Sequence, residues 1–367
     1  MPNEVVPITG LDQIGLIEDI PPVSLPPNAF SDCRNVRFRD GAVIKMEGDV
    51  NIMPYIQMAD ADVLRYVAWW PNPNLAFASL GYYLIIIEQN VTGMGLRDVA
   101  YLVKVNELGR YSADGSERLL LTPVVDADNM NIPQFKGIFR PGGNWQHTFF
   151  QGGFSLIINN GLEAPRFVLD SEDNTETANV PDFADLPNWE SYAEDPLYQE
   201  LLAMEADESI VDGTLTVTAG VIRDFGDFLV AGNLVERADV IDSATGTTRF
   251  NVILRALPGI VRSSDIAMAG AIPANWNPFA TAVNTADEFT ITNDGIVQDF
   301  VELQGNMFIY SNSSISVMSR TSSSVAPLSV GPVTSAYGAL TTDAVLEFDG
   351  RHLVVGTQDI YLSLIHI

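Results

Sequence analysis

The sequence is poor in the residues that build disulfides and active sites. Cys33 is its single cysteine, so no disulfide can form within the chain, and a disulfide-built secreted scaffold is excluded. The three histidines, His147, His352 and His366, are isolated. The chain also contains no zinc-binding pattern, nucleophile elbow, phosphate-binding loop or dinucleotide fingerprint. We therefore expect no enzyme, with no catalytic, cofactor-binding or metal-ligating residues.

Basic residues are also scarce. The chain carries 19 Lys and Arg against 47 Asp and Glu, which gives a net charge of −28. A protein that grips DNA needs a basic surface, because contacts with phosphates supply most of the affinity. A broad DNA-gripping face is thereby excluded, although such a chain is able to surround a duplex without holding it.

Long hydrophobic runs are missing as well. The longest, Tyr82–Ile87, is far shorter than the ~20 residues with which a helix crosses a bilayer. No Lys or Arg precedes Arg34, and no apolar core with a cleavage site is found there, so the pattern of a signal peptide is absent. We expect synthesis in a cytoplasm and no membrane partner.

Short strand-like runs, rich in β-branched and aromatic residues, occupy most of the chain. Val36–Arg39 and Val43–Met46 flank Asp40-Gly41, a dipeptide that favours a tight hairpin because both turn positions need a positive φ. Helical spacing is best developed in Pro196–Met204, where proline opens the segment and leucines recur at i, i+4. The sequence therefore predicts a mainly β fold.

Three hairpin-like segments resemble one another. They begin at Asp224, Glu302 and Glu347, and each contains an apolar strand, a tight turn with glycine and a second apolar strand. Gly305 and Gly350 in the last two lie 45 residues apart, within the ~40–50-residue period of propeller blades. We expect β-propeller-like blades made of antiparallel hairpins.

The composition divides the chain into five parts. Residues 1–30 are rich in proline and predict an extended arm, because proline lacks an amide donor and fixes φ. Residues 31–166 and 223–361 hold the hairpins and blades. Residues 167–222 contain 14 acids and no Lys or Arg, which predicts an acidic, partly helical insertion. Residues 362–367 are expected to be a non-native tail.

Four segments of the chain share a pattern with one protein family. LPPNAFSDCRNVRFRDGAVIKMEGD, from Leu25 to Asp49, combines a proline-rich lead with a hairpin. NNGLEAPRF from Asn159, IPANWNP from Ile272 and the paired closing hairpins of Gly305–Thr321 and Val330–Leu362 complete the set. Together they resemble the tail tubular protein B, or tail nozzle, family of short-tailed bacteriophages, over most of the chain outside the acidic segment.

The resemblance implies a structural virion protein with β-propeller blades that forms a homo-oligomeric ring, expected to be a hexamer, through which the genome leaves. It implies contacts with the phage adaptor or tail tube protein and with tail fibres, and a location in the phage tail. An acidic ring would repel phosphates at short range, so that double-stranded DNA passes without sticking. The turn residues expected to shape the fold are Asp40, Gly41, Asn160, Gly161, Trp276, Gly305 and Gly350.

The end of the chain departs from the family. Family members are longer, and Leu362–Ile367 resembles a translated transposase sequencing adapter. We expect the chain to be truncated at its C-terminus and His366 to have no biological role. Missing strands would leave exposed sheet edges, which invite non-native pairing.

Two other functions stay open on the sequence alone. One is a receptor-binding or fibre-attachment β module of the virion, although no fibre shaft or collagen-like repeat is present. The other is a β-propeller polysaccharide hydrolase, because a fold could bring two of the many carboxylates across a cleft. The tryptophans that could line such a cleft, although burial of aromatic residues is commoner, are Trp69, Trp70, Trp145, Trp189 and Trp276.

Overall fold

The chain divides into two compact units, Met1–Pro54 and Tyr55–Ile367, and each is described by itself. A computed structural model describes residues 36–39 and 42–45 of the first unit. In the second unit it describes residues 56–71, 81–104, 119–121, 135–169, 183–190, 208–211, 214–242, 245–278, 284–291, 295–334, 337–348, 350–357 and 359–363.

The first unit contributes one antiparallel strand pair. β1 (Val36–Arg39) pairs with β2 (Ala42–Lys45), with Arg39 opposite Ala42. Two residues therefore separate the strands, which is the spacing of a tight hairpin. The predicted turn residues Asp40 and Gly41 lie outside the described residues, as does the predicted proline-rich arm.

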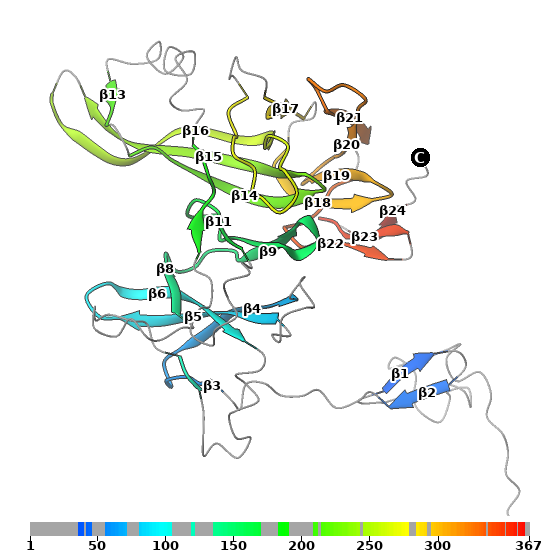
Figure 1. Cartoon of the computed structure of the whole chain (residues 1–367), viewed down its shortest axis with the longest axis horizontal. Coiled ribbons are helices and arrows are strands. Elements are labelled where there is room, and N and C mark those ends of the chain that lie inside the picture. Colours follow the sequence, from blue (N-terminus) through cyan, green and yellow to red (C-terminus); the bar gives the residue numbers. More distant parts are fainter. Residues whose placement is uncertain are drawn as a thin grey trace, which may run out of the picture. The chain divides into compact units, whose positions relative to one another are not determined.

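The second unit is built from five small antiparallel sheets, and its described residues contain no α-helix (Figure 1). The one short helical element in them is a 3-10 turn, η3, at Gln151–Gly153. A short parallel pair joins β3 (Ile56–Gln57) and β7 (Leu119–Leu120). The expectation of a mainly β fold is confirmed. The described residues also include no helix of the length and hydrophobicity that crossing a bilayer would require.

We name each sheet after the first strand of its consecutive run. The β4 sheet contains β4 (Val63–Pro71), β5 (Gly81–Val91), β6 (Gly95–Lys104) and β8 (Phe135–Phe139). The β9 sheet contains β9 (Gln146–Phe150), β10 (Ser155–Asn159), β11 (Arg166–Leu169) and β12 (Ala184–Asp185). The β14 sheet contains β14 (Thr216–Phe225), β15 (Phe228–Asp242), β16 (Thr248–Ser263), β17 (Asp287–Thr290) and the short β13 (Glu208–Ile210).

The last two sheets are the β18 sheet and the β22 sheet. The first contains β18 (Val297–Leu303), β19 (Asn306–Ser311), β20 (Ile315–Arg320) and β21 (Leu328–Thr334). The second contains β22 (Val345–Phe348), β23 (Arg351–Val355) and β24 (Ile360–Ser363). In all five sheets, the strands of the consecutive run pair with their neighbours in chain order, so each sheet is an antiparallel meander.

Four hydrophobic clusters join these sheets in chain order. One cluster lies between the β4 and β9 sheets and includes Trp70 and Ile158, and the next lies between the β9 and β14 sheets. A third joins the β14 and β18 sheets around Phe300, and a fourth joins the β18 and β22 sheets around Phe308. Because period-2 alternation sends neighbouring side chains to opposite faces, one strand can serve two clusters. The β9, β14 and β18 sheets each contribute to two clusters.

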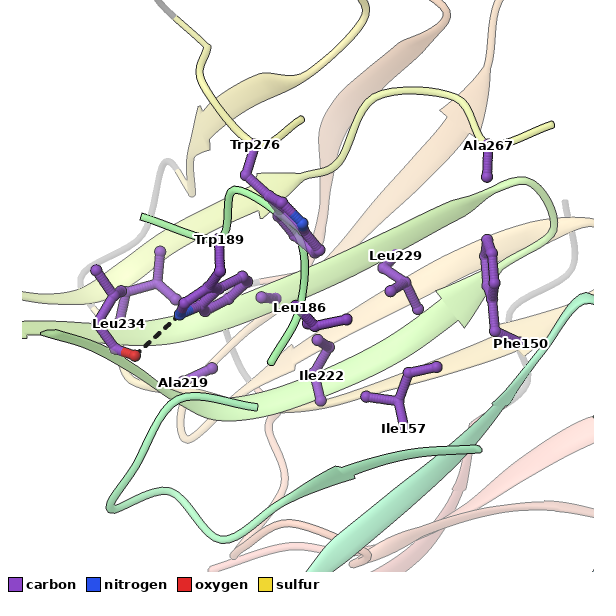
Figure 2. Close-up of a cluster of buried hydrophobic side chains, with 12 residues drawn as sticks. Phe150, Ile157, Leu186, Trp189, Ala219, Ile222, Leu229, Leu234, Ala267 and Trp276 are labelled. Carbon is purple, nitrogen blue, oxygen red and sulfur yellow. Dashed lines mark hydrogen bonds between the residues drawn. The ribbon is translucent and has the colours of Figure 1, made fainter. Parts of the chain in front are cut away.

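The cluster between the β9 and β14 sheets shows how the residues fit (Figure 2). Ile157 of β10 faces Ile222 and Leu229 across the interface, and all three are fully buried. Trp189 and Trp276 meet edge to face, with ring centroids 4.6 Å apart, and Trp189 Nε1 donates to the Val217 carbonyl at 2.9 Å. Fully burying one such large apolar side chain stabilises the folded state by ~1.5–3 kcal/mol. This cluster therefore contributes strongly to the packing of the β9 sheet on the β14 sheet.

The described sheets do not close into a ring, so no closed propeller is present in this part of the chain. Part of the predicted acidic insertion is described, and this part contains strands and turns. Its first residues end β11, and its last residues, Thr216–Ile222, lie in the largely buried β14. The predicted helix at Pro196–Met204 lies outside the described residues.

Candidate functional site

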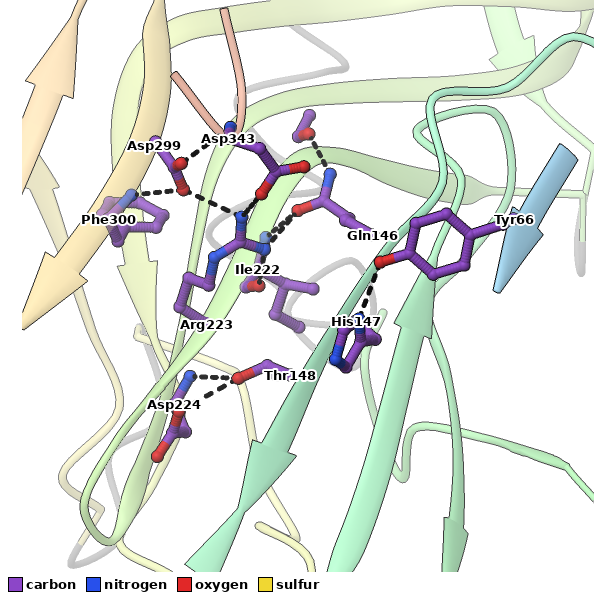
Figure 3. Close-up of polar contacts among 11 residues, drawn as sticks. Tyr66, Gln146, His147, Thr148, Ile222, Arg223, Asp224, Asp299, Phe300 and Asp343 are labelled. Atoms are coloured by element: carbon purple, nitrogen blue, oxygen red, sulfur yellow. Dashed lines mark hydrogen bonds and ion pairs between the residues drawn. The ribbon is translucent and has the colours of Figure 1, made fainter. Parts of the chain in front are cut away.

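The first strands of the five sheets meet one another. β9 contacts β14, β14 contacts β18, and β18 contacts β22. β4 joins the series through Tyr66, whose hydroxyl hydrogen bonds with His147 Nδ1 of β9 at 2.7 Å. Polar and charged side chains lie along these contacts, which makes this meeting point the candidate site (Figure 3).

Arg223 of β14 holds the site together. Its guanidinium donates to Gln146 Oε1 of β9 at 2.8 Å and to Asp343 Oδ1, just before β22, at 2.7 Å. It also lies 3.0 Å from Asp299 Oδ1 of β18. One planar fork of donors thus ties together residues from four sheets or their leading loops, a task for which guanidinium geometry is well suited.

Asp299 is the buried acid of the site. Its side chain is almost fully buried, and it accepts hydrogen bonds from the Phe300 amide at 2.9 Å and the Asp343 amide at 2.8 Å. Burial raises the pKa of Asp299 above its ordinary value, and the Arg223 charge partly offsets that rise. Both oxygens of the carboxylate already accept hydrogen bonds, and in this way Asp299 holds β18 and the start of β22 together.

Three consecutive residues of β9 reach in opposite directions. Gln146 and Thr148 face β14, where Thr148 Oγ1 donates to Asp224 Oδ1 at 3.0 Å and accepts from the Asp224 amide at 3.2 Å. His147 faces Tyr66 of β4 instead (Figure 3). This alternation follows from the two-residue period of a strand, and it allows β9 to bridge both neighbours.

Burial also perturbs the Tyr66–His147 pair. It raises the pKa of Tyr66 to about 12, with a further rise from Asp343, and it lowers the pKa of His147, with a further fall from Arg223. The pair is therefore neutral over the physiological pH range and acts as a hydrogen-bonded link. A second pair of the same kind joins Tyr310 and His352 Nδ1, at 2.8 Å, between the β18 and β22 sheets.

An open cavity of about 270 Å³ lies beside Arg223. Its acidic lining residues are Asp224, Asp299, Glu302, Asp343 and Glu347, and among the described residues Arg223 is the one base that lines it. Within the described residues, no group of three or more His, Cys, Asp or Glu side chains is arranged to hold a metal ion. The excess of carboxylates gives this surface a negative potential, which repels phosphate groups within a Debye length of ~8–10 Å.

The predicted turn residues that the structure describes neither bind Arg223 nor line the cavity, and they have structural roles. Asn160 Oδ1 accepts from the Leu162 and Glu163 amides, both at 3.0 Å, and Gly161 follows with a φ of 72°. Gly305, with a φ of 76°, ends the two-residue turn between β18 and β19. Gly350, with a φ of 68°, lies in the turn between β22 and β23. Trp276 is buried in the cluster between the β9 and β14 sheets.

The residues of the polar site carry almost no recognisable signal in the sequence. Arg223 had one recognisable signal, because it is the first base after the acidic segment 167–222. Gln146, Asp299 and Asp343 had none, since they come from separate sheets and only the packing of those sheets brings them together.

No known family model matches this chain, and no curated protein matches it.

Proposed function

We propose that the chain is a structural subunit of a bacteriophage tail tube or nozzle, which forms a ring channel for genome ejection and catalyses no reaction. The observation that carries the proposal is the succession of meander sheets, packed in chain order and joined at their first strands by one polar site. The resemblance of Leu25–Asp49 and Gly331–Leu362 to the nozzle family is the reason for proposing a tail nozzle as the assembly.

The finer fold in this proposal is a set of propeller blades. A blade is a meander of about four antiparallel strands that packs on the next blade and sends its first strand toward the centre. The described sheets have the first two properties, and the contacts of β9, β14, β18 and β22 are those expected of innermost strands. In this account, residues 1–30 are an arm, and the acidic segment 167–222 connects two blades, since it begins in β11 and ends in β14.

The contacts of the polar site favour a structural role over a catalytic one. A glycosidase needs two carboxyl groups held across an accessible cleft, one of them ready to give up or accept a proton. Asp299 is instead bound by two backbone amides and by Arg223, and Asp224 is bound by Thr148. Carboxylates engaged in this way serve to hold strands together.

The charge of the chain suits a channel for DNA. With a net charge of −28 per subunit, a ring of copies would carry a strong negative potential. Two like charges 4 Å apart repel by about 1 kcal/mol in water and by more near protein. A duplex would therefore pass without adhering to the wall, while the adaptor and the tail fibres bind other surfaces of the ring.

Electron microscopy of the protein mixed with the phage adaptor complex tests this proposal. We expect rings with sixfold symmetry that bind to the adaptor ring. The matched control is the protein without adaptor at the same concentration. Monomers that ignore the adaptor would contradict the proposal.

Two further assays separate the remaining alternatives. Cleavage of capsular polysaccharide that is lost in Asp224→Asn or Asp299→Asn would support the hydrolase. Binding to host cells by single subunits, without ring formation, would support a receptor-binding module.

A further inference from the structure

The β22 sheet has an apolar face that stays uncovered in the described part of the chain. On its other face, Val345 and Val354 pack on the β18 sheet. The strand register places Leu346, Leu353 and Leu362 in one row across β22, β23 and β24. Because side chains alternate between the two faces of a sheet, this row points away from Val345 and Val354. We call this surface the β22 face, and its six apolar side chains, which are 38–69% exposed, are Leu346, Phe348, Leu353, Val355, Ile360 and Leu362.

The β22 face is large and almost without charge. At these exposures its side chains present roughly 500 Å² of surface, within the ~300–600 Å² of the largest apolar patches on soluble monomers, which are often interaction sites. Along the three described strands, its one charged residue is Arg351, opposite Phe348, and it holds no acid in a protein with 47 acids. Two copies that each carry a net charge of −28 repel least where acids are missing.

A second exposed apolar surface lies on β4. Leu64, Val67 and Trp69 pair with residues of β5 that alternate with members of the cluster around Trp70. Their side chains therefore share the face of the β4 sheet that points away from that cluster, and they are 38–40% exposed. The ring of Trp69 packs on that of Tyr83, with centroids 4.9 Å apart. We call these three side chains the β4 patch, which contains no acid.

We infer that the β22 face of one copy binds the β4 patch of a second copy, an inference that rests on the proposed ring-forming function. The β9, β14 and β18 sheets each share a cluster with the sheet before and the sheet after, whereas the β4 and β22 sheets share one with a single neighbour. The β4 sheet of a second copy would continue this order at the β22 face. Both surfaces stay exposed in the single chain, so they do not cover each other there. Because the two surfaces differ, the contact is head-to-tail and can close into a ring.

The size of the two surfaces suits such a contact. Together they present roughly 800 Å² of apolar surface, and with a polar rim the contact reaches the ~1,200 Å² of the smaller specific interfaces. Trp69 supplies an aromatic side chain of the kind that most often dominates the binding energy of an interface. The contact would therefore be held by apolar burial between surfaces without acids.

Three double variants test the contact. Phe348→Thr/Ile360→Thr alters the β22 face, and Leu64→Thr/Val67→Thr alters the β4 patch but leaves Trp69 on Tyr83. Threonine is chosen because it favours strands. The matched control, Met268→Thr/Val325→Thr, changes two apolar side chains outside both surfaces that are 81% and 80% exposed. Thermal unfolding checks that each protein folds like the wild type, and mass photometry over a concentration series measures association.

Each surface variant alone is expected to associate at least ~10-fold more weakly than the wild type and the control, because one side of every contact is altered. A mixture of the two variants should form dimers and nothing larger, since one intact β22 face then meets one intact β4 patch. Self-association of the β4-patch variant at the wild-type level would mean that two β22 faces bind each other, and it would overturn the inference. Equal association of all three variants would overturn it as well.

Salt gives a second readout. Raising the salt concentration from about 0.05 to about 0.5 M should leave wild-type association equal or make it stronger, because salt screens the repulsion between acidic copies and an apolar contact needs no opposite charges. Association that weakens steadily with salt would contradict an apolar contact.

The outcomes separate the inference from the proposed function. Rings that form normally on the adaptor with either surface variant would leave the nozzle proposal standing and overturn the contact. Dimers in the mixture of variants, with a wild-type protein that forms open chains and no ring, would support the contact and count against the nozzle. A wild-type protein that stays monomeric at all concentrations and with the adaptor would overturn both.

Discussion

The β14 sheet and the β22 sheet have similar local sequences but different surroundings. Both contain tight hairpins between apolar strands, in DFGDF and EFDGRH. β14 and the first half of β15 are covered on both faces, by clusters shared with the β9 and β18 sheets. The β22 sheet is covered on one face alone, where Val345 and Val354 meet the β18 sheet. Its other face exposes Leu346, Phe348, Leu353, Val355, Ile360 and Leu362.

The difference shows that the neighbours of a hairpin decide its stability. Apolar side chains stabilise a sheet only to the extent that they leave water, at roughly 25 cal/mol per Å². The exposed side chains of the β22 sheet are aligned across the strands, as in the row Leu346, Leu353 and Leu362, but alignment without cover contributes little. We expect the β22 sheet to be the first of the five to open.

The largest expected effect comes from truncating a phenylalanine that both the β14 and β18 sheets bury. Phe300→Ala should lower the free energy of unfolding by ~3–5 kcal/mol, because it leaves a cavity between two packed sheets. Phe348→Ala in the β22 sheet is the matched control, with 64% exposure and an expected change within ~0.5 kcal/mol. Chemical denaturation measures both, and equal losses would show that the contrast between the sheets is wrong.

The next effect is expected at the polar site. Arg223→Met would leave the buried Asp299 carboxylate without its cation and should cost about 3 kcal/mol. Adding Asp299→Asn removes the buried charge and should recover part of that loss. Urea unfolding of the single and double variants checks this coupling. Strictly additive losses would mean that the two side chains do not act on each other.

A smaller effect is expected where the chain passes between the β18 and β22 sheets. A Cβ at Gly338 would lie 2.3 Å from the Ser311 carbonyl oxygen, so Gly338→Ala forces the backbone apart and should cost ~1–3 kcal/mol. A Cβ at Gly331 meets nothing within 4 Å, so Gly331→Ala serves as the control. Calorimetry should show a lower Tm for Gly338→Ala alone. A Gly331→Ala protein that is equally destabilised would contradict crowding as the cause, because the entropy effect of replacing glycine by alanine by itself favours folding.

The smallest expected effect is a pH dependence of stability, at His352, where the β22 sheet packs on the β18 sheet. Burial lowers the pKa of His352, so below about pH 6.5 the unfolded chain binds more protons than the folded one. The stability contributed by neutral His352 is therefore complete above that pH and falls as the pH drops through it, by at most ~1.4 kcal/mol per pH unit.

His352→Gln keeps an acceptor for Tyr310 and removes this titration. Unfolding measured between about pH 8 and pH 5 should show the wild type losing more stability than the variant. The pKa values of Asp299 and Asp224 are raised, so the contribution of these two carboxyl groups to the stability of the fold falls as the pH rises. This effect runs in the opposite direction, but it is the same in the wild type and in the variant. Parallel curves for the two proteins would contradict this role of His352.

The local parts of the fold were predictable from the sequence, because strands and turns are encoded by neighbouring residues. Alternating apolar residues and glycine turns identified β1 with β2, β18 with β19, and β22 with β23. The acidic composition of 167–222 suggested a single insertion, but Thr216–Ile222 at its end forms a buried strand. Composition averages over a segment and does not locate the point where apolar alternation resumes.

The polar site was not predictable from the sequence. Arg223 and Asp299 are 76 residues apart, and Gln146 lies a further 77 residues before Arg223. No spacing rule links residues on the first strands of separate sheets. They meet because each sheet packs on the next, which is a property of the assembled fold. A single sequence carries no direct record of such long-range pairing.

A cryo-electron microscopy map of the protein bound to the adaptor complex would show whether the chain forms the wall of a channel. We expect a ring of identical subunits, each with its meander sheets packed in chain order, around a channel whose wall is lined mainly by carboxylates. A channel lined by Lys and Arg, with the acids on the outer wall, would contradict passage of DNA past a repelling surface. Isolated subunits beside an empty adaptor would contradict the ring itself.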